Sequence, residues 1–240
     1  MSPSWKQQGA TIVGDVGSVA LSADASIMAI GASWFNDYMG YIKVYHTNDD
    51  GGNRVQFGQT IYGNATYDNF RVSMDITPDG NTLAIGSSKY VRVFSLEGDN
   101  ELGMDNWTQI GQDIIGEANG DQFGWFVSIS KDGKTIAVGA HSNNGVNGVD
   151  SGHVRIYRLV DDGTSWQKIG QDIDGEAPHD DSGWSVSLSA DGNMVAIGSH
   201  NNNENGDETG HGVMVSKNRS KPGHSPSKQQ PATGQQRPNA

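Results

Sequence analysis

Apolar and polar residues alternate over short runs of this chain, and turn sequences separate the runs. Residues 186–189 read Val-Ser-Leu-Ser, the pattern of a strand with one buried face. Ala-Asp-Gly follows at 190–192 and predicts a tight turn, because aspartate accepts hydrogen bonds from nearby backbone N–H groups and glycine adopts positive φ. The apolar run at 194–198 predicts a strand covered on both faces. No segment has the period of an amphipathic helix, so we expect almost no helix.

The whole arrangement recurs along the chain. Residues 107–140 and 166–199 align without gaps, so that Trp107 and Trp166 lie 59 positions apart. Weaker copies precede them, with Val55 in place of the tryptophan in the second copy. A period of this length with strand-like content is typical of repeat architectures. We therefore divide residues 1–216 into four units, near 5–54, 55–106, 107–165 and 166–216.

Each unit reads as four short strands, and the strand that begins at the tryptophan is the fourth. This pattern predicts an all-β fold, a β-propeller of about four four-stranded antiparallel blades, because such blades bury their faces against their neighbours. Residues 5–12 supply one fourth strand, and the last unit stops after its third. We expect these two stretches to pair and close the ring. The alternative is an open piece of a larger propeller.

The acidic charge is confined to this repeat region. The net charge is −12, but residues 217–240 hold five basic residues and no acidic one, which leaves 11 basic and 28 acidic residues elsewhere. An acidic body repels phosphates, so nucleic acid is not an expected partner. The basic segment 217–240 also holds four of the seven prolines, with many glutamines and serines, and we predict that it is a disordered tail.

Several classes of chemistry are disfavoured by the sequence. The chain has no cysteine, so it forms no disulfide and no thiolate metal site. No apolar run reaches the length of a membrane span, and the first residues show no signal peptide. Nucleophile-elbow, zinc-protease and phosphate-loop motifs are all lacking. A carboxylate pair for glycoside hydrolysis is defined in space, and nothing in the sequence selects one.

The third unit carries Phe123-Gly124 followed by the apolar run Ile-Ala-Val-Gly-Ala at 136–140, and the fourth carries Ser182-Gly183 followed by a similar run. These units resemble FG-GAP repeats, the blades of the integrin α-chain propeller. The resemblance implies a β-propeller that binds proteins or glycans, as extracellular adhesion proteins do. The family's calcium loops do not carry over, because turns such as Ser-Lys-Asp-Gly are too short to surround the ion.

Polar loops join the second and third strands of the last two units, at residues 143–152 and 201–210. Oxygen atoms at this density are able to bind Ca²⁺ or the hydroxyl groups of a sugar. The alternative is a plain turn-rich loop, since Asn, Asp and Gly also dominate turns. We expect no cofactor, with Ca²⁺ as the alternative. The candidate ligands in these loops are Asn143, Asp150, Asn203 and Asp207.

Two pairs of aligned residues precede the innermost strands. Asp121 and Asp180 form an acidic ring on one face in one interpretation, and satisfy backbone N–H groups in the other. Trp125 and Trp184 either stack on a sugar ring or a peptide at the propeller mouth, or pack between blades. Packing is the role we expect for Trp107 and Trp166.

Histidines recur with the same period, among them His141 and His200. A shared metal would need them close together, and we expect separate blades to hold them far apart. The function predicted first is therefore a non-enzymatic binding scaffold for a protein or glycan. The alternatives are a carbohydrate-active enzyme or lectin with carboxylates and aromatics at the propeller mouth, and a fragment of a longer repeat protein without a function of its own.

Overall fold

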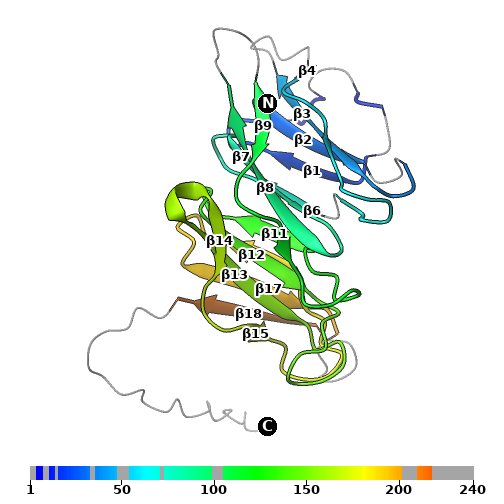
Figure 1. Cartoon of the computed structure of the whole chain (residues 1–240), viewed down its shortest axis with the longest axis vertical. Helices are drawn as coiled ribbons and strands as arrows, with labels where there is room; N and C mark the ends of the chain where they lie inside the picture. The colour runs from blue at the N-terminus through cyan, green and yellow to red at the C-terminus, as the bar shows by residue number, and fades with distance from the viewer. Residues whose placement is uncertain are drawn as a thin grey trace, which may run out of the picture.

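The computed structural model describes residues 4–7, 11–13, 16–32, 36–47, 54–70, 73–98, 105–201 and 210–217. Four antiparallel sheets follow one another along the chain (Figure 1). The single helical segment within the described residues is the 3-10 turn Asp161–Gly163. The prediction of an all-β fold with almost no helix is confirmed. The predicted tail lies outside the described residues from 218 onwards.

Each sheet is built from strands that are consecutive in the sequence. The first sheet contains β1 (Ser18–Leu21), β2 (Ile27–Ala32), β3 (Tyr41–Thr47), β4 (Arg54–Gln56) and β5 (Ile61–Tyr62). The second contains β6 (Ser73–Ile76), β7 (Thr82–Gly86), β8 (Tyr90–Glu97), β9 (Asn106–Gln109) and β10 (Ile114–Ile115). The third contains β11 (Phe126–Ile129), β12 (Thr135–Ala140), β13 (His153–Val160), β14 (Ser165–Lys168) and β15 (Ile173–Asp174). The fourth contains β16 (Ser182–Leu188), β17 (Met194–Ser199) and β18 (His211–Ser216).

An aspartate organises the turn between the first two strands of every sheet. In the third sheet, Asp132 Oδ1 accepts hydrogen bonds from Ser130 Oγ at 2.6 Å and from the Lys134 backbone N–H at 3.0 Å. The same pair of contacts recurs in the other three turns, around Asp24, Asp79 and Asp191. The predicted turn chemistry therefore sets these four hairpins.

The first strands of successive sheets lie side by side. Asp75 Oδ2 on β6 accepts hydrogen bonds from Ser128 Oγ at 3.1 Å and from the Ile129 N–H at 2.9 Å, both on β11. Ser128 Oγ in turn accepts the Leu188 N–H of β16 at 3.1 Å. Inner strands joined in this way, with the other strands running outward, give the radial arrangement of propeller blades. The hydrophobic core lies between neighbouring sheets, where Phe70, Leu83 and Ile136 are fully buried.

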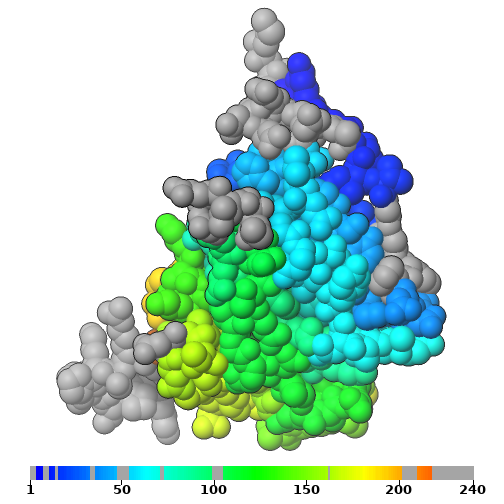
Figure 2. Space-filling view, turned by 45° about the horizontal axis from the view of Figure 1, so that its top comes forward, coloured from blue at the N-terminus to red at the C-terminus, as the bar shows by residue number. Residues whose placement is uncertain are grey.

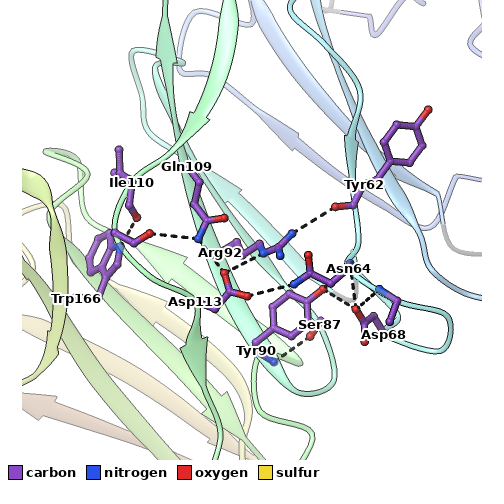
Figure 3. Close-up of polar contacts among 12 residues, drawn as sticks. Tyr62, Asn64, Asp68, Ser87, Tyr90, Arg92, Gln109, Ile110, Asp113 and Trp166 are labelled. Atoms are coloured by element: carbon purple, nitrogen blue, oxygen red, sulfur yellow. Dashed lines mark hydrogen bonds and ion pairs between the residues drawn. The ribbon is translucent and has the colours of Figure 1, made fainter.

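A tryptophan on the fourth strand fastens each of the two middle sheets to the preceding sheet. Trp166 of β14 donates its indole Nε1–H to the Ile110 carbonyl at 2.9 Å, as Figure 3 shows. Gln112 accepts the Trp166 backbone N–H at 3.0 Å and donates to its carbonyl at 2.7 Å. We call the Ile110-Gly111-Gln112 stretch and its surroundings a Trp socket. Trp107 makes the same contacts with the socket of Phe57, Gly58 and Gln59.

Both socket tryptophans are buried, at 2% and 3% exposure, which confirms their predicted packing role. The prediction that Val55 replaces the tryptophan in the second unit is wrong by one residue. Gln56 pairs with Tyr45 in β3 as Gln109 pairs with Phe94 in β8, so Arg54 occupies the tryptophan position. Gly58 and Gln59 align with Gly111 and Gln112 and so define the register of this unit. The apolar side chain of Val55 resembles tryptophan in character but lies one position later.

The predicted closure of the ring is wrong. Among the described strands β18 pairs with β17 alone, and Trp5 is fully exposed. Ile12 and Val13 instead border a small cavity over β2 and β3 of their own first sheet. The first sheet and β18 lie at opposite ends of an open array (Figure 1). Whether the first and last sheets meet depends on the rotation between successive sheets. Local sequence patterns do not specify that rotation, so they could not predict the closure.

Candidate functional site

The linker between sheets ends in a buried aspartate that binds the chain's own N–H groups. Asp180 Oδ2 accepts from the backbone of Glu176 at 2.9 Å and of Ala177 at 2.8 Å. Asp121 Oδ2 accepts from the Ala118 N–H at 3.0 Å and from Asn143 Nδ2 at 2.9 Å. Asp121 is 7% exposed and Asp180 is 2% exposed, so both carboxylates are turned inward. This geometry matches the turn-stabilising interpretation of these acids.

Asp68 has the corresponding place in the preceding linker. Its Oδ2 accepts hydrogen bonds from the Ala65 N–H at 2.9 Å and from the Tyr90 hydroxyl at 2.9 Å, as Figure 3 shows. Burial, and then the hydrogen bond to the Asp68 carboxylate, raise the pKa of Tyr90 far above its ordinary value. The Tyr90 phenol therefore stays protonated and donates its hydrogen bond to the Asp68 carboxylate of this linker.

The polar loop at 143–152 rests on the linker that follows it. The Asp181 N–H donates to the Asp150 carbonyl at 3.1 Å, and the His179 N–H donates to the Val149 carbonyl at 2.8 Å. Figure 1 shows the loops after β12 and β15 side by side. Both therefore belong to one end of the sheets, where a ligand would meet them together.

The candidate ligands in the polar loops differ in accessibility. Asn143 is buried and points at Asp121, so its side chain holds the loop in place. Asp150 is more exposed, and its carboxylate lies 3.7 Å from His179 Nδ1. Asn203 and Asp207 lie outside the described residues. Within the part of the chain that is described, no group of three His, Asp or Glu side chains is placed to hold a metal ion.

Four aromatic rings gather at this end of the third and fourth sheets, and we call them the Trp–His cluster. The Trp125 and Trp184 rings have centroids 6.5 Å apart. His141 contacts both, at 5.3 Å from Trp125 and 4.8 Å from Trp184. His200 stacks on Trp184 at 4.7 Å and an interplanar angle of 24°. The cluster bridges two sheets.

Strand ends position these rings. Trp125 directly precedes β11, and His141 directly follows its partner β12. In the next sheet, Trp184 lies on β16 and His200 directly follows β17. In an antiparallel pair the start of the first strand lies beside the end of the second. The 59-residue repeat therefore places one tryptophan and one histidine at the same end of each of these two sheets. The expectation that His141 and His200 lie far apart is wrong, because both contact the same indole.

The cluster runs from the interior to solvent. His141 is buried, the two indoles are partly exposed, and His200 is exposed. Burial lowers the pKa of His141, against the raising effect of the Asp181 and Asp150 charges, so its ring is neutral near neutral pH. Its buried Nδ1 has no hydrogen-bond partner among the described residues.

Polar groups border the cluster on the fourth sheet. Asn201 Nδ2 donates to Asp181 Oδ2 at 2.5 Å, and the Trp184 N–H donates to the Asp181 carbonyl at 3.1 Å. The site thus combines aromatic faces with amide and carboxylate groups. The sequence indicated the two tryptophans as candidates but did not indicate the histidines that complete the cluster, although their equal spacing was visible.

Comparison with known proteins agrees with this architecture. Residues 116–157 match the family model of the FG-GAP repeat, which confirms the resemblance for the third unit. A crystal structure of Sqt1 from Chaetomium thermophilum superposes with a TM-score of 0.54 at 19% identity, over 78% of this chain and 42% of that one. The fold is β-propeller-like.

A second solved structure supports the same conclusion. The chain is similar to a putative 6-phosphogluconolactonase from Bacteroides uniformis ATCC 8492, with a TM-score of 0.52 at 12% identity, over 84% of this chain and 55% of that one. The propeller-like chain thus spans about half the length of the structures it matches. No curated protein sequence matches it. None of its helical turns within the described ranges is long and apolar enough to cross a membrane.

Proposed function

We propose that this chain is a non-enzymatic binding scaffold and that the Trp–His cluster contacts its ligand, a glycan or a protein segment. The observation that carries the proposal is the pair of partly exposed indoles, Trp125 and Trp184, 6.5 Å apart on neighbouring sheets. Aromatic faces supply large apolar contact area and stack on flat sugar rings or side chains.

The surroundings of the cluster support this function. Asp181 accepts the Trp184 backbone N–H, and Asn201 directly follows His200 and bonds to Asp181, so both bring hydrogen-bonding groups for hydroxyls or amides to the cluster. Backbone hydrogen bonds from Asp181 and Ser182 fix the loop at 143–152 to the next sheet. A surface held rigid before binding loses little conformational entropy when the ligand arrives. FG-GAP repeats and propeller-like relatives also favour a binding platform.

Binding to a glycan array, with and without Ca²⁺, tests the proposal, alongside a peptide-display selection for protein segments. We expect a defined set of ligands that the variant Trp184→Ala no longer binds. Tyr62→Ala is the matched control, because Tyr62 is an aromatic residue at 48% exposure on the first sheet. Circular dichroism verifies that both variants are folded. Ligands that bind Trp184→Ala as well as the parent would contradict the role of the cluster, and so would the absence of any ligand.

A further inference from the structure

The third sheet carries a third Trp socket, which faces the fourth sheet. Ile169, Gly170 and Gln171 correspond in the repeat to the residues that hold Trp166. A Cβ on Gly111 would lie 2.5 Å from Trp166 Cδ1, whereas a Cβ on Gly170 would meet nothing within 4 Å. An apolar cavity of about 340 Å³ lies here, with Ile156, Leu188 and Val215 in its lining.

The edge of β18 beside this socket is unpaired among the strands that the structure describes. β8 and β13 each pair with a tryptophan strand, β9 and β14, but among the described strands β18 has no such partner. Met214 on β18 is 68% exposed and Met194 on β17 is 42% exposed. An open edge with apolar side chains beside it is a site for addition of a strand.

The first residues of the chain have the spacing of a tryptophan strand. Trp5 precedes Ile12 by the same interval that separates Trp107 from Ile114. Trp5 is fully exposed, while Ile12 lies over β2 and β3. Within the same chain the first sheet and β18 lie at opposite ends of the array (Figure 1). Figure 2 shows the N-terminal residues in blue at the outer end of the molecule.

Charge complementarity favours this particular strand. In the second sheet Arg92 Nε lies 3.0 Å from Asp113, and in the third Arg155 lies 2.8 Å from Asp172. Each pair joins the third strand to the segment after the tryptophan. In the fourth sheet Val213 occupies the arginine position. An aspartate brought there would be left without its cation.

The segment at the start of the chain avoids that conflict, because Thr11 occupies the position of Asp113 and carries no charge. Apolar groups are also exposed on the first sheet, where Val19 and Leu21 are 63% and 55% exposed. Ile12 and Val13 border part of that face, and the outer face of the fourth sheet exposes Met194 and Met214.

We propose that the third Trp socket binds Trp5 of a second copy of this chain, and that the segment around Trp5 pairs with the edge of β18. The first sheet of the second copy then packs on the fourth sheet of the first, as neighbouring sheets pack within the chain. Each copy uses one socket and one tryptophan, so the contact is head-to-tail and either closes a ring or extends.

Sedimentation velocity over a range of protein concentrations tests this assembly. We expect the parent chain to form dimers and larger species as its concentration rises. Trp5→Ala and Gln171→Ala remove the two halves of the contact and should each leave monomers. Both side chains are exposed in the monomer, so the thermal melts of these variants at low concentration should be unchanged. Ile115→Ala is the matched control and should assemble like the parent, because Ile115 is 69% exposed on the second sheet, outside both halves of the contact.

A mixture of the two variants distinguishes this geometry from any other association. Trp5→Ala retains its socket, and Gln171→Ala retains its tryptophan, so one intact contact forms between them. We expect the mixture to give dimers and nothing larger. A parent chain that stays monomeric at all concentrations would overturn the proposal, and so would variants that assemble as the parent does.

Discussion

Gln112 and Trp166 hold each other across two sheets through a pair of backbone-directed hydrogen bonds. The glutamine amide accepts the Trp166 N–H at 3.0 Å and donates to the Trp166 carbonyl at 2.7 Å. Gln59 and Trp107 repeat the arrangement one sheet earlier, at 2.8 and 2.6 Å. These contacts join consecutive sheets at their outer strands, while Asp75 and Ser128 join them at their inner strands.

Replacement of Gln112 by alanine should therefore weaken the whole array. Loss of two hydrogen bonds to a buried backbone segment should cost about 1–3 kcal/mol. Gln171→Ala is the matched variant, since Gln171 has the same place in the last unit but is exposed. At low protein concentration it should change stability by less than about 0.5 kcal/mol. Urea denaturation measures both, and equal losses would contradict the role of the socket.

The socket glycines provide a second matched pair. Gly111 and Gly170 have φ of +70° and +76°, so alanine is strained at both positions. Only at Gly111 would the new methyl group also collide with an indole. We expect Gly170→Ala to cost about 1 kcal/mol and Gly111→Ala about 2–4 kcal/mol in thermal or urea unfolding. A larger loss for Gly170→Ala would show that the strain differs between the two sites.

Ala25 is expected to be replaceable by glycine with a gain in stability. It has φ of +61° in the first turn, where the later turns have glycine, as at Gly192 with φ of +65°. Relief of this strain should exceed the entropic cost of glycine and stabilise the chain by about 0.5–1 kcal/mol. The reverse change, Gly192→Ala, should destabilise, because a Cβ there would be 2.9 Å from Thr135 of the preceding sheet. A fall in the melting temperature of Ala25→Gly would contradict this account.

Acid should destabilise the protein before its carboxylates titrate. Burial lowers the pKa of His141 and of His153 below 6.5. Between these folded values and 6.5 the unfolded chain binds more protons, so stability falls as pH decreases through this window and is fully present above it. The urea midpoint should therefore be lower at about pH 5.5 than at about pH 7.5. The double variant His141→Gln, His153→Gln should show a flatter dependence; an undiminished slope would assign the effect to other groups.

The repeat pattern was sufficient to predict the sheets because its signals are local. Alternation, apolar runs and Asp-Gly turns each act within one hairpin, and Trp107 and Trp166 pack as expected. The ring closure failed because it depends on rotation between sheets. The misplacement of the second tryptophan strand had a different origin: the register follows Gly58 and Gln59, whereas apolar character alone favoured Val55.

The candidate site was predicted only in part. Trp125 and Trp184 were recognisable as an aligned pair, and the structure brings them together. His141 and His200 join them because the end of the second strand meets the start of the first, a tertiary relationship that aligned copies suggest but do not state. Asp121 and Asp180 proved to face their own linkers. Residue type alone does not reveal the direction in which a carboxylate points.

The most direct test of the binding proposal follows the indole N–H resonances in a two-dimensional NMR spectrum while a glycan or peptide ligand from the binding screens is added. Trp107 and Trp166 serve as internal controls, because both are buried in their sockets. The proposal predicts that the Trp125 and Trp184 signals shift together and saturably while the socket signals stay in place. Ligand binding that leaves Trp125 and Trp184 unshifted would contradict it.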